Sequence, residues 1–238
     1  MGCFSNMKYM GSKNRYKKDL LPILLKDRKP GQYYVEPFCG SCSIICEVEP
    51  PCIANDNHYY LISMWKALQK GWIPPAFVSN EQYDYVRQFK ELYFDPCLVG
   101  YVGFNSYGGK WFGGYPRDKA NKRDYWDEYY RNIMKQVPKL KDIIFICGDY
   151  TQMDIPPNSI IYADPPYENT TKYKGKFDHI KFWDWCRQQQ LEHQVYISEY
   201  NTPDDFECIW SKQVNNTLVQ HTGSKQGIEK LWRYHVDG

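Results

Sequence analysis

The sequence predicts an α/β protein with a mostly parallel sheet, an antiparallel C-terminal edge and a small inserted lobe that is mainly helical. Short apolar runs that suit buried strands recur along the 238 residues, and segments with helical periodicity separate the first of them. The pattern breaks between residues 69 and 141, where tyrosine, tryptophan, glycine and lysine replace the aliphatic runs. One main domain is therefore expected over residues 1–68 and 142–238, with residues 69–141 inserted in it.

The expected elements follow in chain order. Leucines at helical spacing predict a helix over residues 15–25, in which Pro22 marks a kink or a late start and Pro30-Gly31 marks the end. Strands are expected over residues 33–38 and 52–56, and helices over residues 43–47 and 59–68. After the insertion, strands are expected at residues 143–150, 160–164 and 194–198, and segments near residues 210–214, 217–221 and 230–235 suit an antiparallel edge.

The composition excludes several classes of protein. Hydrophobic residues make up 42% of the chain and charged residues 24%, as in a folded domain, and no apolar run approaches the ~18 residues that span a bilayer. No signal peptide is visible, so the 9 cysteines are expected to be reduced thiols of a cytoplasmic protein. Cys39 and Cys42 form a C-x-x-C, but no second pair follows, and they are interpreted as small apolar residues rather than metal ligands.

The distribution of charge is more informative than its sum. The 30 basic and 28 acidic residues leave a net charge of +2, which indicates no particular partner. Residues 7–30 and 105–141, however, each hold an excess of basic side chains that could contact phosphates. A solvated helix face explains each cluster equally well when it is taken singly.

The strongest chemical signal is Asp164-Pro165-Pro166-Tyr167, which follows an apolar strand directly. Proline carries no N–H and disfavours helical backbone in the residue before it, so the two prolines form a stiff loop. The loop offers two acceptors, the Asp164 carboxylate and the Pro165 carbonyl, beside the flat face of Tyr167. Because ligands of open α/β sheets bind at the C-terminal ends of strands, the pattern predicts a site for a planar group that carries an NH₂.

A second signal lies near the N-terminus. The strand expected over residues 33–38 turns at Gly40, where backbone can approach a ligand closely. Asp56 ends the next expected strand, and an acidic residue there can accept both hydroxyls of a ribose. The chain contains no G-x-G-x-x-G motif, so a cofactor that carries a pyrophosphate is not indicated.

These motifs resemble those of a known family. Asp-Pro-Pro-Tyr after a strand looks like the signature of methyltransferases that modify N6 of adenine or N4 of cytosine in DNA, and Pro37-Phe38-Cys39-Gly40 resembles their Pro-Phe-x-Gly loop for S-adenosylmethionine. The segment from Lys8 to Lys13 resembles the Lys-Trp-x-Gly-x-Lys segment of Dam-type DNA adenine-N6 methyltransferases, with Tyr9 in place of the tryptophan. Gly148-Asp149-Tyr150 resembles the segment that closes over the adenine of the cofactor.

The resemblance implies a Rossmann-like S-adenosylmethionine-dependent methyltransferase fold and transfer of a methyl group to N6 of an adenine flipped out of DNA. S-adenosyl-L-methionine is the implied cofactor. The implied catalytic residues are Asp164, Pro165, Pro166 and Tyr167. The implied cofactor-binding residues are Tyr9, Lys13, Pro37, Phe38, Gly40, Asp56, Asp149, Tyr150 and Asp164. No metal is needed for this chemistry.

The inserted lobe is expected to recognise double-stranded DNA, because it interleaves basic and aromatic residues between glycines. Its expected DNA contacts are Tyr107, Lys110, Trp111 and Arg117. Methylation of N4 of cytosine in DNA or of N6 of adenine in RNA remains an alternative, as does a DNA-binding relative without catalytic activity. The sequence leaves open whether a restriction enzyme acts on the same DNA site, and no membrane partner is expected.

Overall fold

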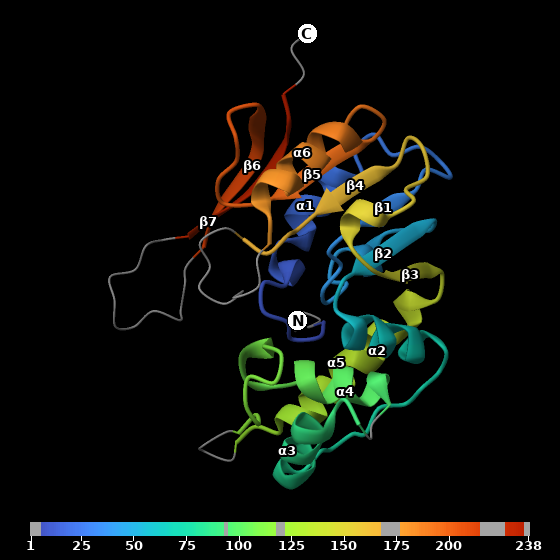
Figure 1. The fold of residues 1–238 in the computed structure, drawn as a ribbon, viewed down its shortest axis with the longest axis vertical. Helices are drawn as coiled ribbons and strands as arrows, with labels where there is room; N and C mark the ends of the chain where they lie inside the picture. The colour runs from blue at the N-terminus through green and yellow to red at the C-terminus, as the bar shows by residue number, and fades with distance from the viewer. Residues whose placement is uncertain (1–5, 93–94, 118–121, 168–176, 215–226, 236–238) are drawn as a thin grey trace.

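A seven-stranded sheet with the order β3-β2-β1-β4-β5-β7-β6 forms the centre of the protein (Figure 1). The structure is a computed structural model that describes residues 6–92, 95–117, 122–167, 177–214 and 227–235. The strands are β1 (Tyr34–Glu36), β2 (Cys52–Asp56), β3 (Ile143–Cys147), β4 (Ile160–Ala163), β5 (Gln194–Ser198), β6 (Phe206–Val214) and β7 (Gly227–Tyr234). Strands β1 to β5 pair in parallel, and β7 runs antiparallel to both β5 and β6. The predicted fold class, a mostly parallel sheet with an antiparallel C-terminal edge, is confirmed.

The order of the strands in the sheet reverses at β1: from β1 the chain first adds β2 and β3 on one side and then β4 and β5 on the other. Strand β1 pairs with β2 on one side and with β4 on the other, with Val35 opposite both Ile53 and Ile161. Because β1 to β5 are parallel, their C-terminal ends lie along one edge of the sheet. An edge with such a reversal is where open α/β sheets bind their ligands.

Helices cover both faces of the sheet and build a separate group beyond it. They are α1 (Lys17–Leu24), α2 (Tyr59–Gln69), α3 (Asn80–Phe89), α4 (Pro96–Phe104), α5 (Tyr125–Gln136) and α6 (His179–Gln189). Short 3-10 helices are η1 (Lys13–Arg15), η2 (Ile45–Glu47), η3 (Tyr107–Gly109), η4 (Val137–Leu140) and η5 (Tyr150–Gln152). Figure 1 shows α3, α4 and α5 gathered at the end of the molecule opposite β6 and β7. All assigned elements between α2 and β3 are helical in the described residues.

The central strands are buried on both faces, as parallel strands between helices usually are. Every residue of β1, β2 and β4 is buried. On one face Tyr34 and Ala54 join a core with α1, α2 and α4, while Val35 and Ile53 on the other face pack into a core with Phe182 and its neighbours on α6. This burial keeps the strand ends, and the loops that follow them, in fixed positions.

Some local predictions need correction. Residues 43–47 do not begin an α-helix: only the 3-10 helix η2 forms, because Val48 already returns to extended backbone (φ −105°, ψ 131°). Helix α1 continues through Pro22, and α6 was not expected. The segment near residues 217–221 lies outside the described residues. Within the described parts of the chain, no helix has the length and apolarity needed to cross a membrane.

Candidate active site

The predicted site residues come from loops at one edge of the sheet. Gly40 follows β1, Asp56 ends β2, Asp149 follows β3 and Asp164 follows β4. The parallel pairing of these strands therefore brings together residues that are far apart in the sequence. The N-terminal segment that precedes α1 adds Tyr9 and Lys13.

Gly40 forms a tight turn against Asp56. Its φ of +46° lies in the left-handed region that favours glycine, and its amide donates to Asp56 Oδ2 (3.2 Å). Its carbonyl accepts from Trp65 Nε1 (3.0 Å), which comes from the buried side of α2. The amide of His58 donates to Asp56 Oδ1 (2.9 Å). Each Asp56 oxygen thus holds one backbone N–H and keeps further lone pairs that can accept from a ligand.

The carboxyl of Asp56 is buried, and this burial raises its pKa to about 6, with the hydrogen bonds from His58 and Gly40 as partial offsets. Two neutral backbone donors therefore do not fully replace the water that the carboxylate has lost. A pair of ligand hydroxyl groups would complete its hydrogen bonding. The residue type, burial and position at a strand end fit the ribose of a nucleoside cofactor.

Asn55 fixes the two loops that flank the Asp56 carboxylate, a role that no sequence motif indicates. Its side-chain Nδ2 donates to the carbonyls of Pro37 (2.9 Å) and Gly148 (3.0 Å), and its backbone carbonyl accepts from Cys39 N (2.7 Å). The side chain is 1% exposed. Asn55 therefore locks the loops after β1 and β3 at a set spacing.

Phe38 and Tyr150 form an aromatic wall beside these loops. Their ring centroids lie 5.1 Å apart, and Phe38 also contacts Phe177 and Phe182. Asp149 next to this wall is exposed and accepts from Thr151 N (2.9 Å), which caps η5. The wall suits a planar ring, while Asp149 is held chiefly as a helix cap.

Tyr9 lies directly against the Gly40 turn. A Cβ added to Gly40 would stand 3.0 Å from Tyr9 Cε1, so the absence of a side chain at Gly40 lets the ring approach. Tyr9 also packs against Phe104 of α4, with ring centroids 5.4 Å apart, and Met10 N donates to Gly109 O (3.1 Å). The N-terminal segment thus runs between the turn after β1 and the helical insertion.

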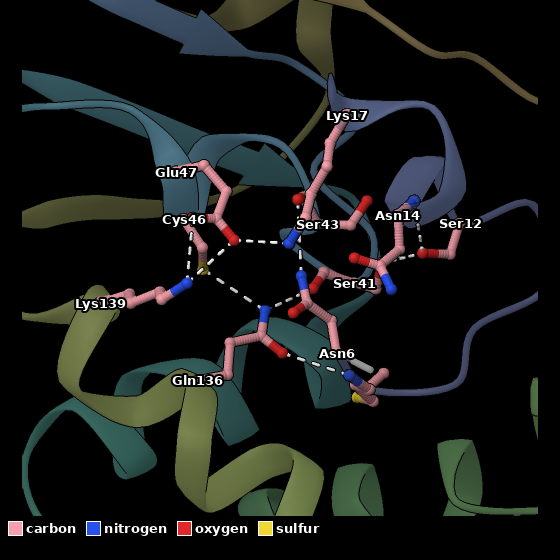
Figure 2. A network of polar contacts seen from close by, with 11 residues as sticks. Asn6, Ser12, Asn14, Lys17, Ser41, Ser43, Cys46, Glu47, Gln136 and Lys139 are labelled. Atoms are coloured by element: carbon pink, nitrogen blue, oxygen red, sulfur yellow. Dashed lines mark hydrogen bonds and ion pairs between the residues drawn. The ribbon is translucent and has the colours of Figure 1, made fainter. Parts of the chain in front are cut away.

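A buried polar network supports the same turn from below (Figure 2). Gln136, at the end of α5, donates from Nε2 to Ser41 O (2.8 Å) and to Cys46 Sγ (3.3 Å). Its Oε1 accepts from Met7 N (3.3 Å). Close by, Glu47 pairs with both Lys17 (2.6 Å) and Lys139 (2.9 Å), and these pairs lower the pKa of its carboxyl although partial burial opposes them. One side chain at the end of α5 therefore contacts both the turn and the N-terminal segment.

Asp164 lies at the centre of a second cluster. The Lys13 ammonium is 2.8 Å from Asp164 Oδ1 and 3.5 Å from Glu229 Oε1 on β7, and it lies over the Tyr167 ring, 4.6 Å from the centroid. The Tyr167 hydroxyl donates to Glu229 Oε1, and the Tyr200 ring packs edge-on against Tyr167 (4.6 Å). A cationic N–H donor thus occupies both features predicted for the site, a carboxylate and an aromatic face.

Burial controls the ionisation of this cluster. It raises the pKa of Asp164 to about 6, and the Lys13 ammonium offsets only part of that effect. Burial alone would lower the pKa of Lys13, but Asp164 and Glu229 more than offset it and raise that pKa above its usual value. Burial also raises the pKa of the neighbouring Glu36 well above its usual range, although Tyr34 donates to it (3.2 Å). Lys13 therefore stays charged at neutral pH, whereas burial favours the protonated form of Glu36.

The four residues expected to contact DNA occupy different environments. Tyr107 is 64% exposed. Trp111 is partly buried in an aromatic cluster, stacked on Tyr60 of α2 at 5.5 Å. Arg117 is exposed above the Tyr115 ring (5.6 Å), and Lys110 is partly buried. Trp111 therefore contributes to the core of the helical group, and the other three line its surface.

The C-x-x-C cysteines are buried beside the Gly40 turn. Burial raises the pKa of the Cys39 thiol and, more strongly, that of Cys42, so neither is a reactive thiolate at neutral pH. Among the residues that the structure describes, no group of three His, Cys, Asp or Glu side chains could hold a metal ion.

Glu229 was missed by the sequence analysis. It is a single acidic residue in an edge strand, and no local motif marks it. Only the pairing of β7 with β5 brings it to Asp164. Glu36 was likewise expected only as a strand residue, although it is 4% exposed beside the cluster.

The chain is similar to a known protein family and to a solved structure. Residues 9–96 match the family described as D12 class N6 adenine-specific DNA methyltransferase. The crystal structure of SMU.472 complexed with SAH, a protein proposed to be a methyltransferase, is similar at 13% sequence identity and a TM-score of 0.39. That match covers 97% of this chain and 55% of the other, so the chain spans about half the length of that protein. The resemblance to adenine-N6 DNA methyltransferases is confirmed, since residues 9–96 match the D12 class of that family.

Proposed function

We propose that the protein transfers a methyl group from S-adenosyl-L-methionine to N6 of an adenine flipped out of double-stranded DNA. The observation that carries the proposal is the Lys13 ammonium against Asp164 (2.8 Å) and over Tyr167 (4.6 Å). The same carboxylate and ring can receive an exocyclic amine and the purine that bears it. The family match over residues 9–96 supports adenine as the base and DNA as the substrate.

The residues of the Gly40 turn fit the donor. Asp56 has lone pairs for two ribose hydroxyls, and its buried carboxylate lacks full hydrogen bonding. Phe38 and Tyr150 offer a wall for the adenine ring. Tyr9 and Lys13, from the N-terminal segment, border this proposed donor site. When bound, S-adenosyl-L-methionine supplies an electrophilic methyl group on its sulfonium.

Asp164 and Pro165 carry the chemistry in this proposal. The N6 lone pair of adenine is delocalised into the ring, so the free amine is a poor nucleophile. If the Asp164 carboxylate and the Pro165 carbonyl accept hydrogen bonds from the two N–H groups, the nitrogen is drawn towards tetrahedral geometry and its lone pair is freed. The carboxylate also stabilises the positive charge that develops on nitrogen. Pro166 stiffens the loop, and the Tyr167 ring stacks on the flipped base.

The helical insertion is the proposed DNA-recognition lobe, with residues 69–141 as its bounds. Tyr107, Lys110 and Arg117 lie on its surface, and Lys110 and Arg117 have no ion-pair partner among the described residues. In contrast, Lys8 and Arg123 both pair with Glu128 (3.2 and 2.7 Å). Lys110 and Arg117 are thus cations of this surface that are available to phosphates.

Incubation with labelled S-adenosyl-L-methionine and mixed-sequence DNA, followed by digestion to nucleosides, tests the proposal. The expected product is N6-methyladenine within one sequence context. Label in N4-methylcytosine, or in RNA but not in DNA, would replace the proposed substrate with one of the alternatives. Donor binding without transfer to any nucleic acid would identify a non-catalytic relative. A restriction enzyme that cleaves at the same unmethylated site would be the cognate partner.

A further inference from the structure

Lys13 lies between two carboxylates rather than against one. Its ammonium is 2.8 Å from Asp164 and 3.5 Å from Glu229. The Lys13 side chain is 6% exposed and that of Glu229 is 7% exposed. Little water therefore reaches the ammonium. Besides the Gly11 carbonyl (3.2 Å), which carries no charge, its partners are these two carboxylates and the Tyr167 ring.

The position of Lys13 conflicts with the arrival of a target base. The proposed function, on which this inference rests, gives the Asp164 carboxylate and the Tyr167 face to the target adenine. The ammonium occupies both of these features. It must leave them when the base enters, and a buried charge that loses its partner is strongly unfavourable.

We infer that Glu229 is the residue to which Lys13 transfers when the target amine takes its place at Asp164. The ammonium is already 3.5 Å from Glu229 Oε1, and a move of under about 1 Å gives the ordinary length of a charge-assisted hydrogen bond. Glu229 is a positioning residue for target-base binding, because it keeps Lys13 paired while Asp164 changes partner.

Two features hold Glu229 ready for this role. The Tyr167 hydroxyl donates to its carboxylate, which directs the carboxylate towards the site. Its backbone is fixed in β7, where Glu229 pairs with Lys212 of β6. The Lys212 ammonium pairs with Asp19 (2.7 Å), so the cation beside Glu229 is Lys13.

The test is a double-mutant cycle on DNA affinity. DNA that carries the mapped methylation site is titrated into each protein with S-adenosylhomocysteine, which has no methyl group to transfer. Glu229→Gln should weaken DNA binding at least tenfold while changing S-adenosylhomocysteine affinity less than about twofold. In a Lys13→Met background the same change should alter DNA affinity less than about twofold, because no ammonium then needs a second partner.

Glu207→Gln is the matched control. Glu207 lies on β6, where its carboxylate pairs with Arg233 at the surface, and DNA affinity should not change. If thermal melting shows that Glu229→Gln is unfolded, Glu229→Asp replaces it and should give a smaller loss that again requires Lys13. Unchanged DNA affinity, or an equal loss with and without Lys13, overturns the inference. A wild-type protein that methylates no DNA would instead refute the proposed function.

Discussion

Among single residues, Asp164 is predicted to matter most for catalysis. Asp164→Asn keeps the shape of the side chain but removes the charge that stabilises the developing cation, and such a loss usually costs ~100-fold or more in turnover. Donor affinity should fall much less than turnover, because other donor contacts are assigned to Gly40, in the turn after β1, and to Asp56, at the end of β2. Turnover assays and calorimetric titration measure the two effects.

Asp142→Asn, at an exposed position before β3, is the control. More than about a tenth of wild-type turnover in Asp164→Asn would exclude the assigned role.

The pKa of Asp164, raised to about 6 by burial, predicts the pH dependence of activity. Only the carboxylate form can accept from the target amine. With saturating donor, which removes the effect of Asp56 and its similar pKa of about 6, kcat/KM for DNA should fall about tenfold per pH unit below about pH 6 and level off above it. The same raised pKa favours the folded state at low pH, a contribution that is present below about pH 4 and lost as the pH rises through about 6. The predicted loss of activity is therefore not a loss of folding at this carboxyl. Activity that stays constant from pH 7 to pH 5 would contradict the assignment.

The residues that the sequence did and did not reveal differ in a physical way. Asp164 and Gly40 lie in local motifs, where a proline pair or a tight turn constrains the backbone. Glu229, Asn55 and Gln136 have no such mark, because each acts through contacts with distant segments. The contact from Gln136 to Ser41, for example, exists only after α5 packs beneath the turn. Spacing along a chain cannot report contacts that the tertiary fold creates.

Between strands and helices, the turn after β1 gives a further prediction. Gly40→Ala forces an alanine to φ +46° and brings its Cβ to 3.0 Å from Tyr9. The backbone strain should lower the free energy of unfolding by ~1–2 kcal/mol, and the displaced ring should weaken donor binding several-fold. Thermal or urea unfolding and calorimetry measure these effects.

Gly31→Ala separates strain from function. Gly31 has φ +74° and nothing within 4 Å of an added Cβ, so it should show a similar stability loss with unchanged donor affinity. If both variants bind the donor as the wild type does, the turn after β1 does not contact it.

Strands and helices could be predicted where burial of an element shows as a simple pattern of apolar residues in the sequence. The predicted bounds of β2 and β5 match the structure, because each contains a short apolar stretch, Cys52-Ile53-Ala54 and Val195-Tyr196-Ile197, that packs into the sheet core. Helix α6 escaped prediction because its aromatic residues, Phe182, Trp183 and Trp185, are equally typical of strands. Their burial against the sheet, rather than helix propensity, decides the outcome.

Across the whole molecule, the site lies where the sheet edge meets the helical insertion. Lys13 comes from the N-terminal segment, Asp164 from the end of β4 and Glu229 from the antiparallel edge. The same N-terminal segment contacts Gly109 of the insertion through Met10 and the end of α5 through Met7. The N-terminal segment thus connects the insertion to both parts of the site, because it contacts the insertion and also carries Tyr9, against the Gly40 turn, and Lys13.

The last prediction concerns the surface that binds DNA. If Lys110 and Arg117 contact phosphates, neutralising each should lower the slope of log affinity against log salt by about one unit. If one of them reads a base edge, its loss should instead relax sequence preference, with ~1–3 kcal/mol at stake. Titrations of Lys110→Ala, Arg117→Ala double-mutant protein over a range of salt concentrations separate these outcomes. The matched control is Lys26→Ala, Lys29→Ala, which removes two lysines that precede β1 and so lie towards the amino ends of the strands, away from the site. If the double mutant is folded, binds the donor and keeps wild-type DNA affinity, salt slope and sequence preference, the insertion does not recognise DNA. A reduced slope in the control would instead assign DNA binding to the basic residues around α1.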